Sequence, residues 1–228
     1  MTNFFTKDAA QAYDEKNKHL APIGESMHFL IRLVLKDLPA QSRVLCVGVG
    51  TGAEILSLAQ EYPKWTFVGV DPSEDMLEVC RERLEAAGIA DRCELVQGYV
   101  HGIPEGESFD AVLSILVGHF VAKGERQEFY QAMVERLKPG GYLVNTELSF
   151  DLHSPEFPAM LKNWEQVQLL AGGNEESLKK LPEQLKNILT VLPPEEVETH
   201  MRDGGLSLPI RFFQAFLIVG WFGRKGDL

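Results

Sequence analysis

The clearest pattern of apolar and polar positions in the chain lies between residues 43 and 71. An apolar run at 44–47 is typical of a buried strand, and it breaks into the glycine-rich turn GVGTG. The next segment places four apolar residues on one face of a helix: Ile55, Leu56, Leu58 and Ala59. A second apolar run, 65–70, ends in Asp71. The pattern therefore predicts half of a nucleotide-binding α/β unit.

Apolar strands and amphipathic helices continue to alternate as far as residue 150. Three further strands are predicted, at 93–97 (CELVQ), 109–116 (FDAVLSIL) and 141–148 (GYLVNTEL). One helix is predicted to begin at Pro72 and Ser73 and to end at Gly88. Another lies in KGERQEFYQAMVERLKPGG and stops at its Pro-Gly-Gly. This alternation predicts an α/β fold whose mostly parallel sheet has helices on both faces.

The two ends of the chain differ from this core. Residues 25–38 have helical spacing, and Pro39 ends that helix; residues 4–13 predict a looser helix over the site. Residues 154–205 predict three helices separated by glycines and prolines, of which the first two are an insertion after the fifth strand. Two apolar segments, 210–216 and 216–225, predict a final antiparallel pair of strands.

The inserted helices carry an apolar stripe that includes Trp164. A helical stripe of this kind predicts a cap that packs on itself or on a second subunit, which favours a homodimer. Trp164 is also a candidate for substrate contact.

Composition narrows the class of protein. The formal net charge of -11 disfavours a nucleic-acid substrate, because a negative field repels phosphate backbones. No apolar run reaches membrane-spanning length, and the first twenty residues lack the layout of a signal peptide, so we expect a cytoplasmic protein without a membrane partner. Three cysteines without CxxC spacing predict reduced thiols and no metal site.

The glycine turn and the acid after it point to a nucleotide ligand. Gly48, Gly50 and Gly52 permit a sharp turn and a close approach of a ligand to the backbone, and the helix that follows favours negative charge at its start. Asp71 lies 19 residues after Gly52, about the spacing of an acid that binds ribose hydroxyls. The looser dinucleotide pattern of a nicotinamide-dependent dehydrogenase also fits, with Ala53 at its third small position.

The ordered set of GxGxG, strand-end acid, FDxV and LKPGG resembles the class I S-adenosylmethionine-dependent methyltransferases of small molecules, over residues 40–150. This resemblance implies a Rossmann-like fold with a seven-stranded sheet whose last strand is antiparallel. It also implies one domain, 1–228, made of an N-terminal lid (1–40), a cofactor-binding core (40–150), a helical insertion (151–192) and a last helix with a strand pair (193–228).

The resemblance implies roles for particular residues. S-adenosyl-L-methionine is the implied cofactor, and a small molecule is the implied substrate. Asp71 would hold the ribose, Met76 and Tyr99 would frame the adenine, and the amide of Val100 would meet a ring nitrogen. Tyr13 would face the site from the lid. The remaining implied cofactor contacts are Gly48, Gly50, Thr51, Gly52, Pro72, Ser114 and Ile115.

Two positions depart from the family pattern. The acid usual two residues before the first glycine is Cys46 here, and the acid usual at the end of the third strand is Tyr99. A tyrosine can stack on adenine or donate through its hydroxyl. Glu54, just past the glycines, is a candidate to replace the missing acid.

The last 40 residues resemble the branch that includes carboxy-S-adenosylmethionine synthase, through LPPEEVETH, FFQAF and a hydrophobic final strand. That branch uses an arginine to hold the extra carboxylate, for which Arg202 and Arg211 are the nearby candidates.

Catalysis offers one candidate base. His119 follows the fourth strand, where the sites of this fold lie, although the lack of a fixed partner in the sequence favours a structural role over that of a base. The chain lacks an Asn-Pro-Pro-Tyr motif, which again favours a small-molecule acceptor. Three hypotheses stay open: a methyltransferase, a dehydrogenase, and a non-catalytic cofactor-binding protein on the same fold.

Overall fold

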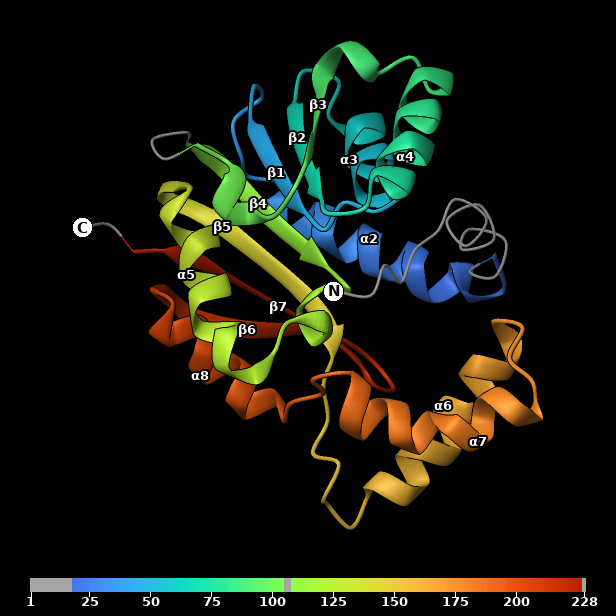
Figure 1. The fold of residues 1–228 in the computed structure, drawn as a ribbon. Coiled ribbons are helices and arrows are strands. Elements are labelled where there is room, and N and C mark those ends of the chain that lie inside the picture. Colours follow the sequence, from blue (N-terminus) through green and yellow to red (C-terminus); the bar gives the residue numbers. More distant parts are fainter. Residues whose placement is uncertain (1–17, 105–107, 227–228) are drawn as a thin grey trace.

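The computed structural model describes residues 18–104 and 108–226 (Figure 1). Seven strands form one sheet: β1 (Arg43–Val47), β2 (Thr66–Asp71), β3 (Cys93–Gln97), β4 (Phe109–Ile115), β5 (Leu137–Leu148), β6 (Leu206–Ala215) and β7 (Ile218–Lys225). The α-helices are α2 (Ala21–Leu35), α3 (Ala53–Glu61), α4 (Glu74–Ala86), α5 (Arg126–Glu135), α6 (Phe157–Leu170), α7 (Glu175–Glu183) and α8 (Pro194–Asp203). The shorter helices are η1 (Lys18–Leu20), η2 (Ala90–Arg92), η3 (Val100–Gly102), η4 (Gly118–Phe120), η5 (Lys123–Glu125) and η6 (Gln184–Ile188).

The strand order is β3-β2-β1-β4-β5-β7-β6. Strands β1 to β5 pair in parallel, whereas β7 is antiparallel to both β5 and β6. Helices α2, α3 and α4 cover one face of the sheet, and α5 and α8 cover the other (Figure 1). The α/β fold with a mostly parallel seven-stranded sheet and an antiparallel last strand is therefore confirmed.

Two apolar cores lie on the two faces of the sheet. One joins α2, α3 and α4 to the inserted helices, and the other joins α5 and α8 to the sheet. The central strand β4 supplies side chains to both: Leu113 packs into the first core and Val112 into the second. Because the central strands are buried on both faces, nearly every position in them is apolar.

The fifth strand begins earlier than the sequence predicts. The expectation placed its start at Gly141, after a Pro-Gly-Gly stop, but β5 begins at Leu137 and includes that segment. Leu137 pairs with Phe109 and Tyr142 pairs with Ala111, so extra residues bulge out of β5 between these pairs. The left-handed backbone of Gly140 permits this bulge, which keeps the strand paired across a turn-forming sequence.

Helix α2 also differs from its predicted bounds of 25–38. It starts at Ala21 and ends at Leu35, with Pro22 in its first turn, where a missing amide costs no hydrogen bond. The predicted lid at 4–13 lies outside the described residues.

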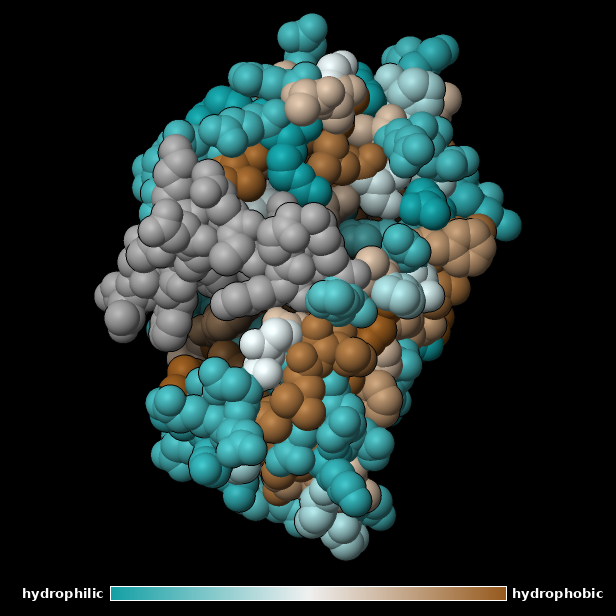
Figure 2. Space-filling view, turned by 90° about the vertical axis from the view of Figure 1, so that its right-hand side faces the viewer, coloured by the Kyte–Doolittle hydropathy of each residue, from teal (hydrophilic) through white to brown (hydrophobic). Residues whose placement is uncertain are grey.

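The insertion after β5 consists of α6, α7 and η6, and the chain rejoins the sheet through a parallel bridge between Ser149 and Leu192. Trp164 is buried in the core that the insertion shares with α2. Apolar side chains remain exposed where the insertion meets solvent: Leu169, Leu170 and Ile188. Figure 2 shows apolar surface over this part of the molecule. No helix among the described residues is long and apolar enough to cross a membrane.

The turn between β1 and α3 packs tightly against two neighbouring elements. A Cβ placed on Gly48 would lie 2.5 Å from Cγ2 of Val117, and one on Gly52 would lie 2.6 Å from Sγ of Cys80. Both glycines also have positive φ, 66° and 80°. Backbone conformation and neighbour contact thus independently require glycine here.

A matched pair of substitutions separates these two requirements. Gly48 and Gly88 share nearly the same φ, 66° and 67°, but a Cβ on Gly88 would meet nothing within 4 Å. We expect Gly88→Ala to cost about 1 kcal/mol of unfolding free energy from backbone strain alone. We expect Gly48→Ala to cost roughly 1–3 kcal/mol more, because Val117 must move. Urea denaturation measures both values, and equal losses would contradict the packing argument.

Candidate functional site

The glycine turn and the end of β2 form one hydrogen-bonded unit. The amides of Gly48 and Val49 both donate to the carbonyl of Val70, at 2.8 and 3.2 Å. The Asp71 carboxylate accepts from the amide of Gly50 through Oδ2 and from the amide of Ser73 through Oδ1, each at 2.9 Å. The structure thus brings the predicted acid against the predicted glycines.

Asp71 stands in a largely buried setting. Burial raises the pKa of Asp71, while the hydrogen bonds from Ser73 and Gly50 oppose that rise. Two backbone donors on one carboxylate favour the ionised form. An ionised acid beside a glycine turn can accept hydrogen bonds from the hydroxyls of a ribose.

Gly50 is the glycine that leaves room for a ligand. Among the described residues, a Cβ placed there would approach only the Met76 methyl, at 3.8 Å, and the carbonyl oxygen of Gly48, at 4.0 Å. Met76 lies in the first turn of α4, whose Ser73 cap accepts from the Met76 amide at 3.3 Å. Met76 is buried and lies beside the turn, and its packing on the adenine stays a prediction.

The other predicted contacts near this turn differ in exposure. Thr51 is buried, and Arg83 donates to both its carbonyl and its hydroxyl, at 3.1 and 2.8 Å. This pairing ties Thr51 to α4. Pro72 is exposed.

The end of β3 lies beside the end of β2. Gly98 donates its amide to the carbonyl of Asp71 at 2.9 Å, which aligns the two strand ends. Tyr99 follows with 53% of its surface exposed, and Val100 is buried. A half-exposed phenol at this edge can form one wall of an aromatic ligand's site.

The end of β4 completes the sheet edge. Ser114 is fully buried in register with Val47 of β1 and Asn145 of β5, and its hydroxyl has no partner within the described part of the chain. Ile115 is partly buried beside it. Leu116 then turns with a φ of 59°, which is rare outside glycine, and its amide donates to Thr146. This turn places Val117 against Gly48.

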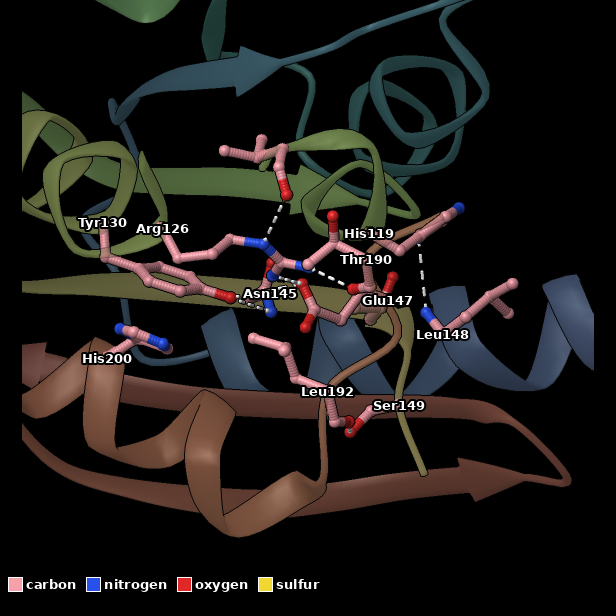
Figure 3. A network of polar contacts seen from close by, with 12 residues as sticks. His119, Arg126, Tyr130, Asn145, Glu147, Leu148, Ser149, Thr190, Leu192 and His200 are labelled. Atoms are coloured by element: carbon pink, nitrogen blue, oxygen red, sulfur yellow. Dashed lines mark hydrogen bonds and ion pairs between the residues drawn. The ribbon is translucent and has the colours of Figure 1, made fainter. Parts of the chain in front are cut away.

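The position of His119 argues against the predicted general base. Its Nδ1 accepts a hydrogen bond from the Leu148 amide at 3.3 Å (Figure 3). Burial and the charge of Arg126 lower the pKa of His119 to about 3. A neutral imidazole has one acceptor nitrogen, and here that nitrogen is occupied, so His119 is a structural residue in this arrangement.

Two of the three predicted substrate contacts, Trp164 and Arg211, lie away from this edge. Tyr13 lies outside the described residues. Trp164 is buried in the core, and this burial accounts for the apolar stripe of the inserted helix on which it lies. Arg211 lies on the edge strand β6, separated from β1 by β4, β5 and β7, and its guanidinium binds Glu195 and Glu198 of α8. Sequence proximity to the tail motif does not bring Arg211 to the site.

Sequence reasoning missed a buried ion pair between Arg126 and Glu147, both without exposed side-chain surface. The available signal was the single charged residue in the predicted strand GYLVNTEL. The described residues contain no cluster of histidine, cysteine or acidic side chains suited to a metal ion.

Glu54 is a second buried acid, in the first turn of α3. Burial raises its pKa from 4.5 to about 8, the nearby Asp71 charge adds to the rise, and its own amide and Arg83 oppose it. Glu54 therefore lies close enough to Asp71 and Arg83 to interact with both electrostatically.

We expect Glu54 to make stability depend on pH. The unfolded carboxyl titrates near 4.5 and the folded one near 8, so the folded protein holds the extra proton between these values. The free energy of unfolding therefore falls as pH rises through this window. Glu54→Gln removes the effect, and its advantage over the native chain should grow to roughly 4–5 kcal/mol by pH 8.5 and nearly vanish near pH 4.5.

Urea denaturation at several pH values measures this difference. Glu61→Gln, at the exposed end of the same helix, is the matched control and should show no such trend. A constant difference between Glu54→Gln and the native chain across pH would contradict the assignment.

Comparisons with known proteins agree with this geometry. A family described as "Methyltransferase domain" matches residues 44–141, which run from β1 into β5. A fatty-acid O-methyltransferase of Mycolicibacterium smegmatis is 32% identical over 120 residues, 52% of this chain and 42% of that protein. A carboxy-S-adenosyl-L-methionine synthase of Methylococcus capsulatus is 24% identical over 219 residues, 95% of this chain and 90% of that protein.

Solved structures share the fold at low identity. An O-methyltransferase family 2 protein from Planctomyces limnophilus, in complex with apigenin, has a TM-score of 0.64 and 18% identity, covering 98% of this chain and 63% of that one. PigF, solved with SAH, has a TM-score of 0.66 and 18% identity, and the match covers 96% of this chain and 60% of that one. The chain thus spans less than two thirds of several relatives. Residues 44–141 match the methyltransferase domain family, and the fold is that of class I S-adenosylmethionine-dependent methyltransferases.

Proposed function

We propose that this protein transfers a methyl group from S-adenosylmethionine to a small-molecule acceptor. The observation that carries the proposal is the joining of the glycine turn to Asp71, with Gly50 as the open position. The residues fit such a cofactor: Asp71 can accept from ribose hydroxyls, Met76 lies beside Gly50, and Tyr99 follows Gly98, whose amide donates to the Asp71 carbonyl.

S-adenosylmethionine, when bound, supplies a methyl group activated by a positively charged sulfur. The chain's own residues then have to bind, orient and exclude water. Gly50 would admit the ligand to the backbone, whereas Gly48 and Gly52 permit the turn, and Val117 packs on Gly48. No described side chain is assigned as a base, so the acceptor reacts in a form that has already lost its proton to solvent, such as a carboxylate or a phenolate.

A small-molecule acceptor is supported by charge and by the relatives. The formal net charge of -11 repels nucleic-acid phosphates. One relative is named for fatty acids and one structure holds apigenin, so carboxylates and phenols are the first acceptors to assay. A dimer through the exposed apolar surface of the insertion stays a prediction.

The decisive experiment pairs cofactor binding with an acceptor panel. Calorimetry with S-adenosylmethionine tests binding, and mass spectrometry of panel reactions detects a product heavier by one methylene together with the demethylated cofactor. Binding without any product over the panel would favour the non-catalytic hypothesis, and affinity for a nicotinamide cofactor instead would favour the dehydrogenase.

We expect Asp71→Asn to weaken S-adenosylmethionine binding roughly 10- to 100-fold, because a charged acceptor of hydrogen bonds is lost. Asp91→Asn, at an exposed position in η2, is the matched control and should bind as the native chain does. Calorimetry gives both dissociation constants. Equal affinity of the two variants would remove Asp71 from the cofactor site.

A carboxy-S-adenosylmethionine synthase activity is the second candidate, because similarity to such an enzyme spans 95% of this chain. The two candidate arginines do not favour it: Arg211 is held by two acids, and Arg202 interacts with Glu198 and Thr199 on α8.

We expect Arg211→Gln to leave cofactor affinity unchanged. The Arg211 guanidinium binds Glu195 and Glu198, and within the described part of the chain it does not contact the site at the ends of β1, β2 and β4. Mass spectrometry of the ligand released from the purified native chain is the companion measurement. A carboxylated cofactor in that sample, with loss of it in Arg211→Gln, would reverse this assignment.

A further inference from the structure

A buried polar network lies under the turn that follows β4. Arg126 of α5 and Glu147 of β5 form an ion pair at 2.6 Å, and neither side chain has exposed surface. Tyr130 donates its hydroxyl to the same Glu147 oxygen at 3.2 Å, and Asn145 donates to Tyr130 at 3.1 Å. Figure 3 shows the side chains converging between α5 and β5.

The other nitrogens of Arg126 bind the backbone of two separate segments. Nε donates to the carbonyl of Val121 at 3.1 Å, and Nη2 donates to the carbonyl of Thr190 at 2.7 Å. Val121 ends the segment 117–121, and Thr190 lies between the helical insertion and α8. One guanidinium thus joins α5, β5, the segment after β4 and the chain leaving the insertion.

Segment 117–121 is held from other directions as well. Thr190 donates its amide to the His119 carbonyl at 2.8 Å, and Leu148 donates to the His119 ring at 3.3 Å. Gly118 lies so close to Glu147 that a Cβ would overlap the carboxylate. At its start, Val117 contacts Gly48 of the glycine turn. The segment therefore adjoins the glycine turn at Gly48, whereas Asp71 and Gly50 contact other groups.

Stability alone does not account for this arrangement. Burial raises the pKa of Glu147, and Arg126, Tyr130 and Asn145 oppose the rise, so the acid depends on its partners to remain ionised. Buried ion pairs commonly contribute less than a hydrophobic replacement of similar size. Their best-supported advantage is a defined geometry.

We propose that Arg126 and Glu147 are positioning residues for methyl transfer, which hold segment 117–121 as the acceptor-side wall beside the glycine turn. The inference rests on the proposed function. Arg126 acts through the segment, and its two carbonyl contacts set where Val117 meets Gly48. The network therefore has a larger effect on turnover than on cofactor affinity.

The test compares Arg126→Lys with Arg136→Lys. Arg136 is also buried on α5's side of the sheet and also donates to carbonyls, those of Ile103, Ala132 and His101, but it does not contact segment 117–121. Lysine retains the charge and loses the planar fork that reaches two carbonyls at once.

We expect Arg126→Lys to lower kcat roughly 10- to 100-fold, because segment 117–121 would no longer position the acceptor correctly. The dissociation constant for S-adenosylmethionine should stay within about threefold of the native value. Amide hydrogen exchange should accelerate in 117–121 in this variant and stay native-like there in Arg136→Lys. Equal effects of the two variants on kcat and on exchange would overturn the proposal.

Glu147→Gln provides a second variant that keeps the shape of the network and removes its negative charge. It should show the same pattern, faster exchange in 117–121 with retained cofactor binding, so the test stands if Arg126→Lys does not fold. The exchange measurement needs no acceptor. A failed acceptor panel therefore weakens the proposed function alone, whereas native exchange in both variants overturns the positioning role.

Discussion

The carboxylate of Asp71 accepts hydrogen bonds from two turns at once, and the shape of the sheet edge depends on both bonds. One donor, Gly50, belongs to the turn between β1 and α3, and the other, Ser73, precedes α4. A ligand hydroxyl that binds Asp71 must share this carboxylate with the Gly50 amide. Ligand binding and the conformation of the glycine turn are therefore coupled through one side chain.

Segment 117–121, which follows β4 at the same end of the sheet, is stabilised by a buried ion pair. Arg126 and Glu147 are fully buried, so each depends on the other for solvation, and the carbonyls of Val121 and Thr190 accept the remaining guanidinium donors. The two anchors meet where Val117 packs on Gly48. Backbone amides hold the glycine turn against Asp71, and the buried ion pair holds segment 117–121. Where these two segments touch, at Gly48 and Val117, only glycine fits on the side of the turn.

The parts of this protein that follow from local pattern were predictable from sequence. Strand β1, the glycine turn and Asp71 each need only neighbouring residues to be identified. The bulge in β5 was not, because its Pro-Gly-Gly forms a turn in isolation and pairing with β4 overrides that preference. The partners of Arg211 were equally hidden, since Glu195 and Glu198 lie on another element. Contacts across the fold carry no signal in sequence spacing.

The acids at this edge differ in what compensates their burial. Asp71 has two amides and Glu147 has a guanidinium, whereas burial dominates at Glu54 and raises its pKa to about 8. Burial also raises the pKa of Cys46, which stands where the family usually has an acid, so that thiol stays neutral. A cationic ligand nearby would favour ionised Glu54, because opposite charge lowers the pKa of an acid.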